Sequence, residues 1–72
     1  DEQLEFNFQF STAKEGQIRI YDFLGRQVDA WEGIILPGQG VFFENTAHWG
    51  EGIFLWKVKI EDEIQTGKII KK

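Results

Sequence analysis

Apolar side chains recur at every second position in two separate stretches of this 72-residue chain. In residues 4–10 and 54–60 these positions are held by Leu4, Phe6, Phe8 and Phe10, and by Phe54, Trp56, Val58 and Ile60. A period of two is the spacing of a β-strand with one buried face, because successive side chains of a strand point to opposite sides. Both stretches are therefore predicted to be strands that bury one face.

Four further runs favour strands, and no segment has a helical period. These runs are residues 17–21, 26–31, 41–44 and 64–71. We expect the strands at 4–10 and 17–21 to be antiparallel neighbours, because only a short polar turn separates them. Residues 33–40, which contain Pro37, are predicted to form a bend, residues 45–52 a loop, and the acidic residues 61–63 a hairpin turn.

Six or seven short strands separated by turn signals predict an all-β fold. A small immunoglobulin-like antiparallel β-sandwich fits this strand count best, and an open barrel of the OB or SH3 type is the alternative. A chain of 72 residues builds one small core, so residues 1–72 are expected to form one domain. Seven Phe and three Trp residues would supply most of the volume of that core.

Composition and motifs favour a chain without catalytic chemistry. His48 is the single histidine, it stands in a glycine-rich loop, and no nucleophile motif surrounds it. The chain has no cysteine, and one histidine with scattered carboxylates lacks the ligand spacing of a zinc site. A net charge of −4 argues against nucleic acid, whose phosphates require a basic face. We therefore expect no enzymatic activity, no cofactor or metal, and no nucleic-acid partner.

Two of the tryptophans, Trp31 and Trp49, leave two interpretations open. They could fill the ends of the sandwich, because a small core needs large side chains there. Alternatively, they could form an exposed platform for sugar rings, as in a carbohydrate-binding or other accessory module of a secreted protein. Trp56 is assigned to the core by its place in the alternation of residues 54–60.

Four pieces of the sequence, taken in order, resemble a known family. They are residues 18–28 (IRIYDFLGRQV), 37–38 (PG), 52–58 (GIFLWKV) and 68–71 (KIIK). Together they look like the type A C-terminal sorting domain of the type IX, or Por, secretion system. That family has a "v-y-D-x-l-G-r-x-v" strand and turn, a "G-x-Y-x-x-x-V" strand and a terminal "K-x-I-x-K" strand. The resemblance extends from about Leu4 to Lys72.

The resemblance implies a secretion signal at the C-terminal end of a longer secreted protein, of the kind that Bacteroidetes-type bacteria use. Such a domain directs a parent cargo domain through the periplasm and the outer membrane to the cell surface or the medium. Its implied partners are the outer-membrane secretion machinery and a sortase-like peptidase. The residues expected to be recognised by the translocon are Lys68, Ile69, Ile70, Lys71 and Lys72.

Two structural expectations accompany this assignment. Gly25, Gly38 and Gly52 are expected to shape turns and not to contact the translocon. An exposed terminal strand carries unpaired backbone groups, so it can be captured by β-augmentation. The same exposure makes a strand-exchanged dimer physically feasible.

Overall fold

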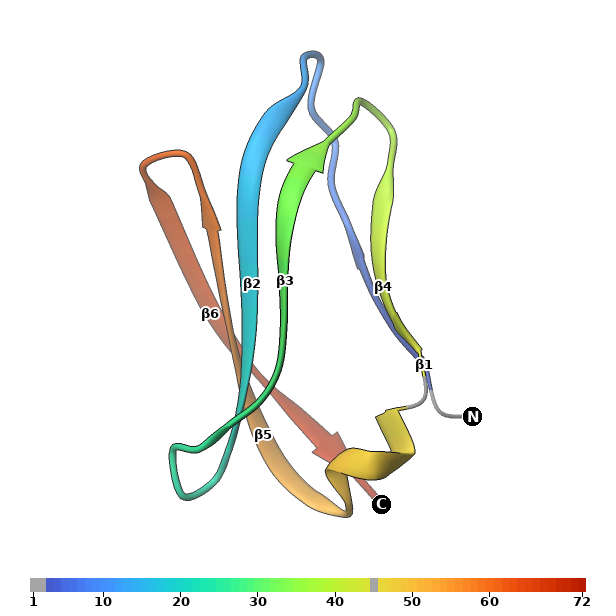
Figure 1. Ribbon diagram of the computed structural model, residues 1–72, viewed down its shortest axis with the longest axis vertical. Helices are drawn as coiled ribbons and strands as arrows, with labels where there is room; N and C mark the ends of the chain where they lie inside the picture. The colour runs from blue at the N-terminus through green and yellow to red at the C-terminus, as the bar shows by residue number, and fades with distance from the viewer. Residues whose placement is uncertain (1–2, 45) are drawn as a thin grey trace.

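Six strands and one short 3-10 helix make up the regular structure of the computed structural model, which describes residues 3–44 and 46–72. The elements in chain order are β1 (Gln3–Asn7), β2 (Lys14–Asp22), β3 (Gln27–Ile35), β4 (Gly40–Glu44), η1 (Thr46–Trp49), β5 (Gly52–Ile60) and β6 (Glu63–Lys71) (Figure 1). Within the described residues, no helix has the length and apolar character that crossing a membrane would need.

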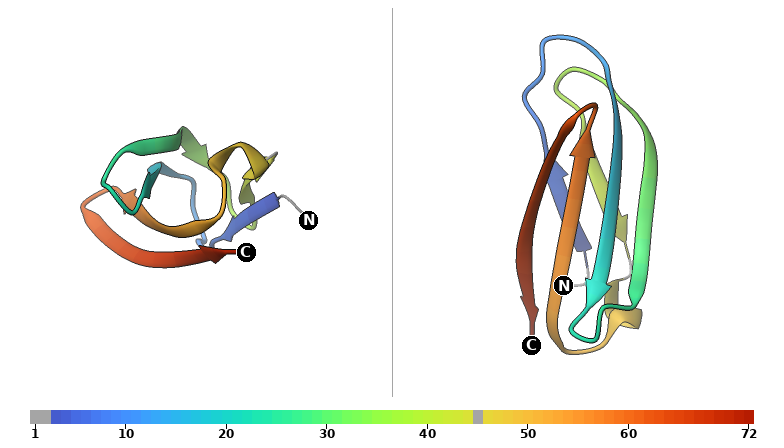
Figure 2. Two further views of the ribbon diagram at one scale, coloured as in Figure 1. Left: turned by 90° about the horizontal axis from the view of Figure 1, so that it is seen from below. Right: turned by 90° about the vertical axis from the view of Figure 1, so that its left-hand side faces the viewer.

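The strands form two antiparallel sheets. The larger sheet has the order β3-β2-β5-β6, and the smaller sheet consists of β1 and β4. The views of Figures 1 and 2 place the β1-β4 pair as a second layer beside the larger sheet. Two packed sheets with inward apolar faces are a β-sandwich. This confirms the predicted all-β sandwich.

The core lies between the two layers and is lined by the inward positions of their strands. Ile18 and Ile20 of the central strand β2 are completely buried. The other buried apolar side chains are Ile35, Val41, Phe43, Trp49, Phe54 and Val58. The alternating residues Leu4, Phe6, Phe8 and Phe10 pack against this cluster and are half-buried. The period of two read from the sequence therefore identifies the faces of β1 and β5 correctly.

The expected pairing of the first two strands is wrong. β1 pairs with β4, with Phe6 opposite Val41, whereas β2 pairs with β3 on one side and β5 on the other. The reason is that β1 and β2 each have an apolar face to bury. When they lie in opposite layers, the side chains of β1 cover those of β2, which neighbours in one sheet cannot do.

Two of the predicted strand boundaries also differ from the structure. β1 ends at Asn7, and the rings of Phe8 and Phe10 stack on each other beyond it, with centroids 5.5 Å apart. β3 continues to Ile35, through the start of the predicted bend. Gly33 is tolerated within this strand because the indole of Trp31 lies over it, so that a Cβ added at Gly33 would come within 3.1 Å of the ring.

The turn between β2 and β3 is organised by the carboxylate of Asp22. Its Oδ1 accepts hydrogen bonds from the backbone N–H groups of Leu24 (3.0 Å) and Arg26 (2.9 Å), and its Oδ2 accepts one from Nε of Arg26 (2.9 Å). Gly25 has a φ of +86°, which suits glycine. These bonds fix the turn, and the bond from the Arg26 backbone N–H is the main reason why the pKa of Asp22 lies below its ordinary value.

Replacing Asp22 by asparagine is expected to lower the Tm by a few degrees at pH 7, because the ion pair with Arg26 is lost. A carboxyl whose pKa is lower in the folded state stabilises the fold above its unfolded pKa, and this contribution disappears as the pH falls through the folded pKa. The Tm difference between wild type and Asp22→Asn should thus shrink as the pH falls below the ordinary titration range of an aspartate. Thermal unfolding followed by circular dichroism at pH 7 and at lower pH measures it, with Asp62→Asn in the exposed β5-β6 turn as control. A Tm difference that does not change with pH would contradict the assigned role of the carboxylate.

Candidate functional site at the terminal strand

The strand β6 contains most of the residues that the sequence singles out for recognition. It forms one edge of the larger sheet, where β5 is its partner along the whole strand, from Glu63 opposite Ile60 to Lys71 opposite Gly52. No strand of the described chain pairs with its other side. The outer edge of β6 therefore presents backbone N–H and C=O groups that a further strand could bind.

The two faces of β6 divide the predicted recognition residues into two groups. Ile69 and Lys71 point inward and are half-buried, and Ile69 packs against the core. Lys68 and Ile70 lie on the outward face, where they are exposed, and Lys72 beyond the strand is exposed as well. This division follows directly from the period of two along a strand. A partner approaching from outside would meet Lys68, Ile70 and Lys72.

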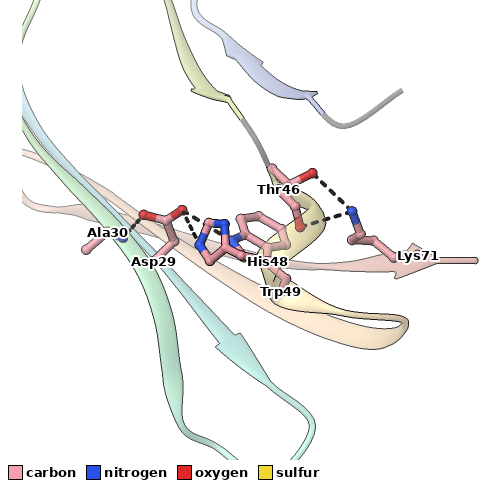
Figure 3. A network of polar contacts seen from close by, with 6 residues as sticks. All are labelled: Asp29, Ala30, Thr46, His48, Trp49 and Lys71. Carbon is pink, nitrogen blue, oxygen red and sulfur yellow. Dashed lines mark hydrogen bonds and ion pairs between the residues drawn. The ribbon is translucent and has the colours of Figure 1, made fainter.

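The inward residue Lys71 connects the end of β6 to the 3-10 helix η1. Its Nζ donates hydrogen bonds to the backbone oxygen of Thr46 (3.1 Å) and to Thr46 Oγ1 (3.0 Å), as Figure 3 shows. The same ammonium group lies 5.9 Å from the centroid of the Trp49 ring, within the range of a cation–π interaction. Because Thr46 and Trp49 are both buried, these contacts hold the end of β6 against the body of the domain.

The helix η1 is in turn attached to β3 through Asp29. The Nε1 of Trp49 donates a hydrogen bond to Asp29 Oδ2 (3.1 Å), and His48 Nε2 lies 3.8 Å from the same oxygen (Figure 3). The backbone N–H of Ala30 donates to Asp29 Oδ1 (2.9 Å). The sequence did not predict the bonds from Trp49 to Asp29 and from Lys71 to Thr46, because their partners are 20 and 25 residues apart and no motif joins them.

This arrangement fits a structural cluster. The Asp29 carboxylate is shared among Trp49, His48 and the backbone, and the His48 ring contacts that of Trp49 edge-on at 6.5 Å. Trp49 is buried and Trp31 packs against the core over Gly33, so both tryptophans fill the sandwich, as one of the two interpretations predicted. Over residues 3–44 and 46–72, no three His, Cys, Asp or Glu side chains group in a way that could hold a metal ion.

Comparison with known protein families identifies the family of this chain. The model of the family described as "secretion system C-terminal sorting domain" matches residues 2–72. The chain belongs to this family. This sorting domain is the signal that directs a cargo protein across the outer membrane through the type IX secretion system, to the cell surface or the extracellular space. Neither the curated proteins nor the solved structures gave a significant match.

Proposed function

We propose that the secretion machinery recognises the sorting domain through the free edge of β6 together with its outward side chains Lys68 and Ile70 and the neighbouring Lys72. The supporting observation is the split of the terminal residues between two faces. Ile69 and Lys71 have contacts within the domain and hold the strand in position. An added strand of the partner would pair with the β6 backbone, and the outward side chains would supply the selectivity.

This assignment includes a route and further partners. The domain is the C-terminal part of a longer secreted protein, and it passes through the periplasm with its parent cargo domain before it reaches the outer-membrane machinery. A sortase-like peptidase then removes it from the cargo. The domain acts as a signal and not as an enzyme, and Gly25, Gly38 and Gly52, with φ values of +86°, +75° and +130°, serve that signal through the turns alone.

The free edge of β6 also permits exchange of this strand between two copies of the domain. Such exchange would occupy the edge that the machinery needs, so the dimer would be inactive as a signal. Sedimentation of the purified domain distinguishes monomer from dimer, and deletion of residues 68–72 should abolish any dimer formed in this way.

The experiment is a secretion assay in a type IX-competent host. The 72 residues are fused behind a signal peptide and a fluorescent reporter, and the reporter in the medium and on the cell surface is measured. Deletion of residues 68–72 should abolish export. The double variant Lys68→Ala/Ile70→Ala should reduce export about tenfold or more, which corresponds to about 1.4 kcal/mol of recognition energy.

The matched control is Lys59→Ala/Ile64→Ala, which also removes one lysine and one isoleucine from the outward face of the β5-β6 pair. These residues are direct partners in the β5-β6 pair but lie at its opposite end. This variant should export within about twofold of wild type, since surface changes away from a recognition site have small effects. Equal export by the two double variants, both shown to be folded by circular dichroism, would refute recognition at residues 68–72.

A further inference from the structure

The turn between β2 and β3 displays two large apolar side chains to solvent. Phe23 is 73% exposed and Leu24 is 76% exposed, and neither belongs to the core or to the side chains packed against it. The Asp22 carboxylate and the backbone bonds from Asp22 to Arg26 and from Gly25 to Asp22 hold this turn in one shape. Apolar side chains presented by an ordered turn are suited to binding, because little conformational freedom remains to be lost.

The exposed pair continues onto the outward face of the larger sheet. Phe23 follows Asp22, which is opposite Phe54 of β5, and Phe54 is preceded by Ile53, whose partner on β6 is Ile70. The next row across the sheet is Tyr21, Leu55 and Lys68. Figure 1 shows the β2-β3 turn, the start of β5 and the end of β6 at the same end of the molecule. Phe23, Leu24, Ile53, Leu55 and Ile70 are all exposed, and we call them the end patch.

Basic side chains border the end patch on the sheet. Lys68 lies beside Leu55, and the following row brings Arg19 of β2 opposite Lys57 of β5. Tyr21, Leu55, Lys57, Thr66 and Lys68 line a shallow hollow here. These three cations are among the eight basic residues of a chain with a net charge of −4, and they lie at the end of the outward face that carries the end patch, whereas Glu15 and Glu32 lie toward its other end. Such a separation of charge selects a partner surface of opposite sign.

We propose that the end patch docks into an apolar groove, rimmed by acidic side chains, on a protein of the secretion machinery. The inference rests on the proposed function and extends the recognition surface from β6 to the β2-β3 turn. A second copy of the domain fits poorly, because two such faces would bring Arg19, Lys57 and Lys68 against each other. An anionic lipid surface fits poorly as well, because the net charge of the whole domain is negative.

The first test compares two double variants in the secretion assay. Phe23→Ser/Leu24→Ser removes the exposed pair and keeps Asp22 and Gly25, which shape the turn. Leu36→Ser/Phe42→Ser removes the same two residue types from exposed positions outside the end patch, where Leu36 is 54% and Phe42 is 48% exposed. The first variant should lower export about tenfold. The control should stay within about twofold of wild type, and both should unfold at the wild-type Tm.

The second test addresses the chemistry of the partner. Charge reversal in Arg19→Glu/Lys57→Glu should reduce export, whereas Arg19→Lys/Lys57→Arg should preserve it. A photocrosslinking amino acid at position 23 of the exported fusion should yield one discrete protein adduct that the charge reversal abolishes. Vesicles of phosphatidylglycerol and phosphatidylcholine are the lipid probe, and they should not bind the purified domain.

The possible outcomes distinguish failure of the end patch inference from failure of the proposed function. If the wild-type fusion stays in the periplasm, the sorting assignment for these 72 residues fails, and the end patch inference fails with it. If wild type is exported and Phe23→Ser/Leu24→Ser is exported equally well, the end patch is not a docking surface. Export that survives charge reversal, or binding to vesicles without a protein adduct, would contradict docking to a protein groove rimmed by acidic side chains.

Discussion

Replacing Gly67 by alanine is expected to destabilise the domain by about 2–3 kcal/mol. Gly67 lies on β6 directly opposite Trp56 of β5, and the indole ring of Trp56 covers its Cα. A Cβ at position 67 would overlap with that ring. The ring is also in edge contact with Phe6 of β1, at 5.6 Å between centroids, so it cannot move without disturbing the opposite layer. For a domain of this size, the loss is a large share of the total stability.

Urea denaturation followed by circular dichroism measures this effect. Thr66→Ala, an exposed neighbour on the outward face of β6, is the control and should change the free energy of unfolding by less than about 0.5 kcal/mol. The double variant Trp56→Leu/Gly67→Ala should be less destabilised than the sum of its two single variants, because the clash disappears with the indole. Additive single effects would show that the overlap with Trp56 is not the cause.

Replacing Trp49 by alanine is expected to cost about 3–5 kcal/mol, comparable to the loss of other large buried aromatic side chains. The Trp49 ring packs against Phe54 at 5.4 Å and against Phe43 at 6.4 Å between centroids. Its Nε1 also donates the hydrogen bond to Asp29. The substitution therefore leaves a cavity, removes one of the partners of the Asp29 carboxylate, and takes away the ring over which Lys71 lies.

Comparison of Trp49→Ala with two further variants separates the packing of the Trp49 ring from its hydrogen bond. Trp49→Phe keeps most of the ring volume and loses the hydrogen bond, so it should be destabilised by about 1–2 kcal/mol. His48→Ala changes an exposed residue of the same helix and should cost less than about 1 kcal/mol. Chemical denaturation gives the three free energies of unfolding. If Trp49→Ala were as stable as His48→Ala, the cluster around η1 would not support the fold as described.

The alternation of apolar side chains was sufficient to predict strands and their buried faces, because that pattern is local. It was not sufficient to predict which strands pair. β1 was expected beside β2, but coverage of two apolar faces places it in the other sheet, a constraint that involves the whole chain. The turn at Asp22 could be located from Gly25, whereas the exposure of Phe23 and Leu24 could not, since apolar residues are usually assigned to a core.

The sequence likewise predicts only part of the candidate site on β6. The period of two is enough by itself to separate Lys68 and Ile70 from Ile69 and Lys71. Lys71 lies on the inward face, where its ammonium group contacts Thr46 and Trp49. The period of two does not predict these contacts, because both residues are remote from Lys71 in the sequence. Asp29 gave no signal in the sequence either, because a single carboxylate in a strand is ordinary.

The strand order also determines how quickly the domain can form. The hairpins β2-β3 and β5-β6 each join neighbouring segments, and such pairs form within microseconds. The pairing of β2 with β5 and of β1 with β4 joins segments far apart in the chain, so closure of the sandwich belongs to the slower class of folding reactions, on the order of milliseconds to seconds. Both hairpins therefore form before the sandwich closes, and the residues at the end of β6 are paired with β5 before the rest of the domain has closed around them.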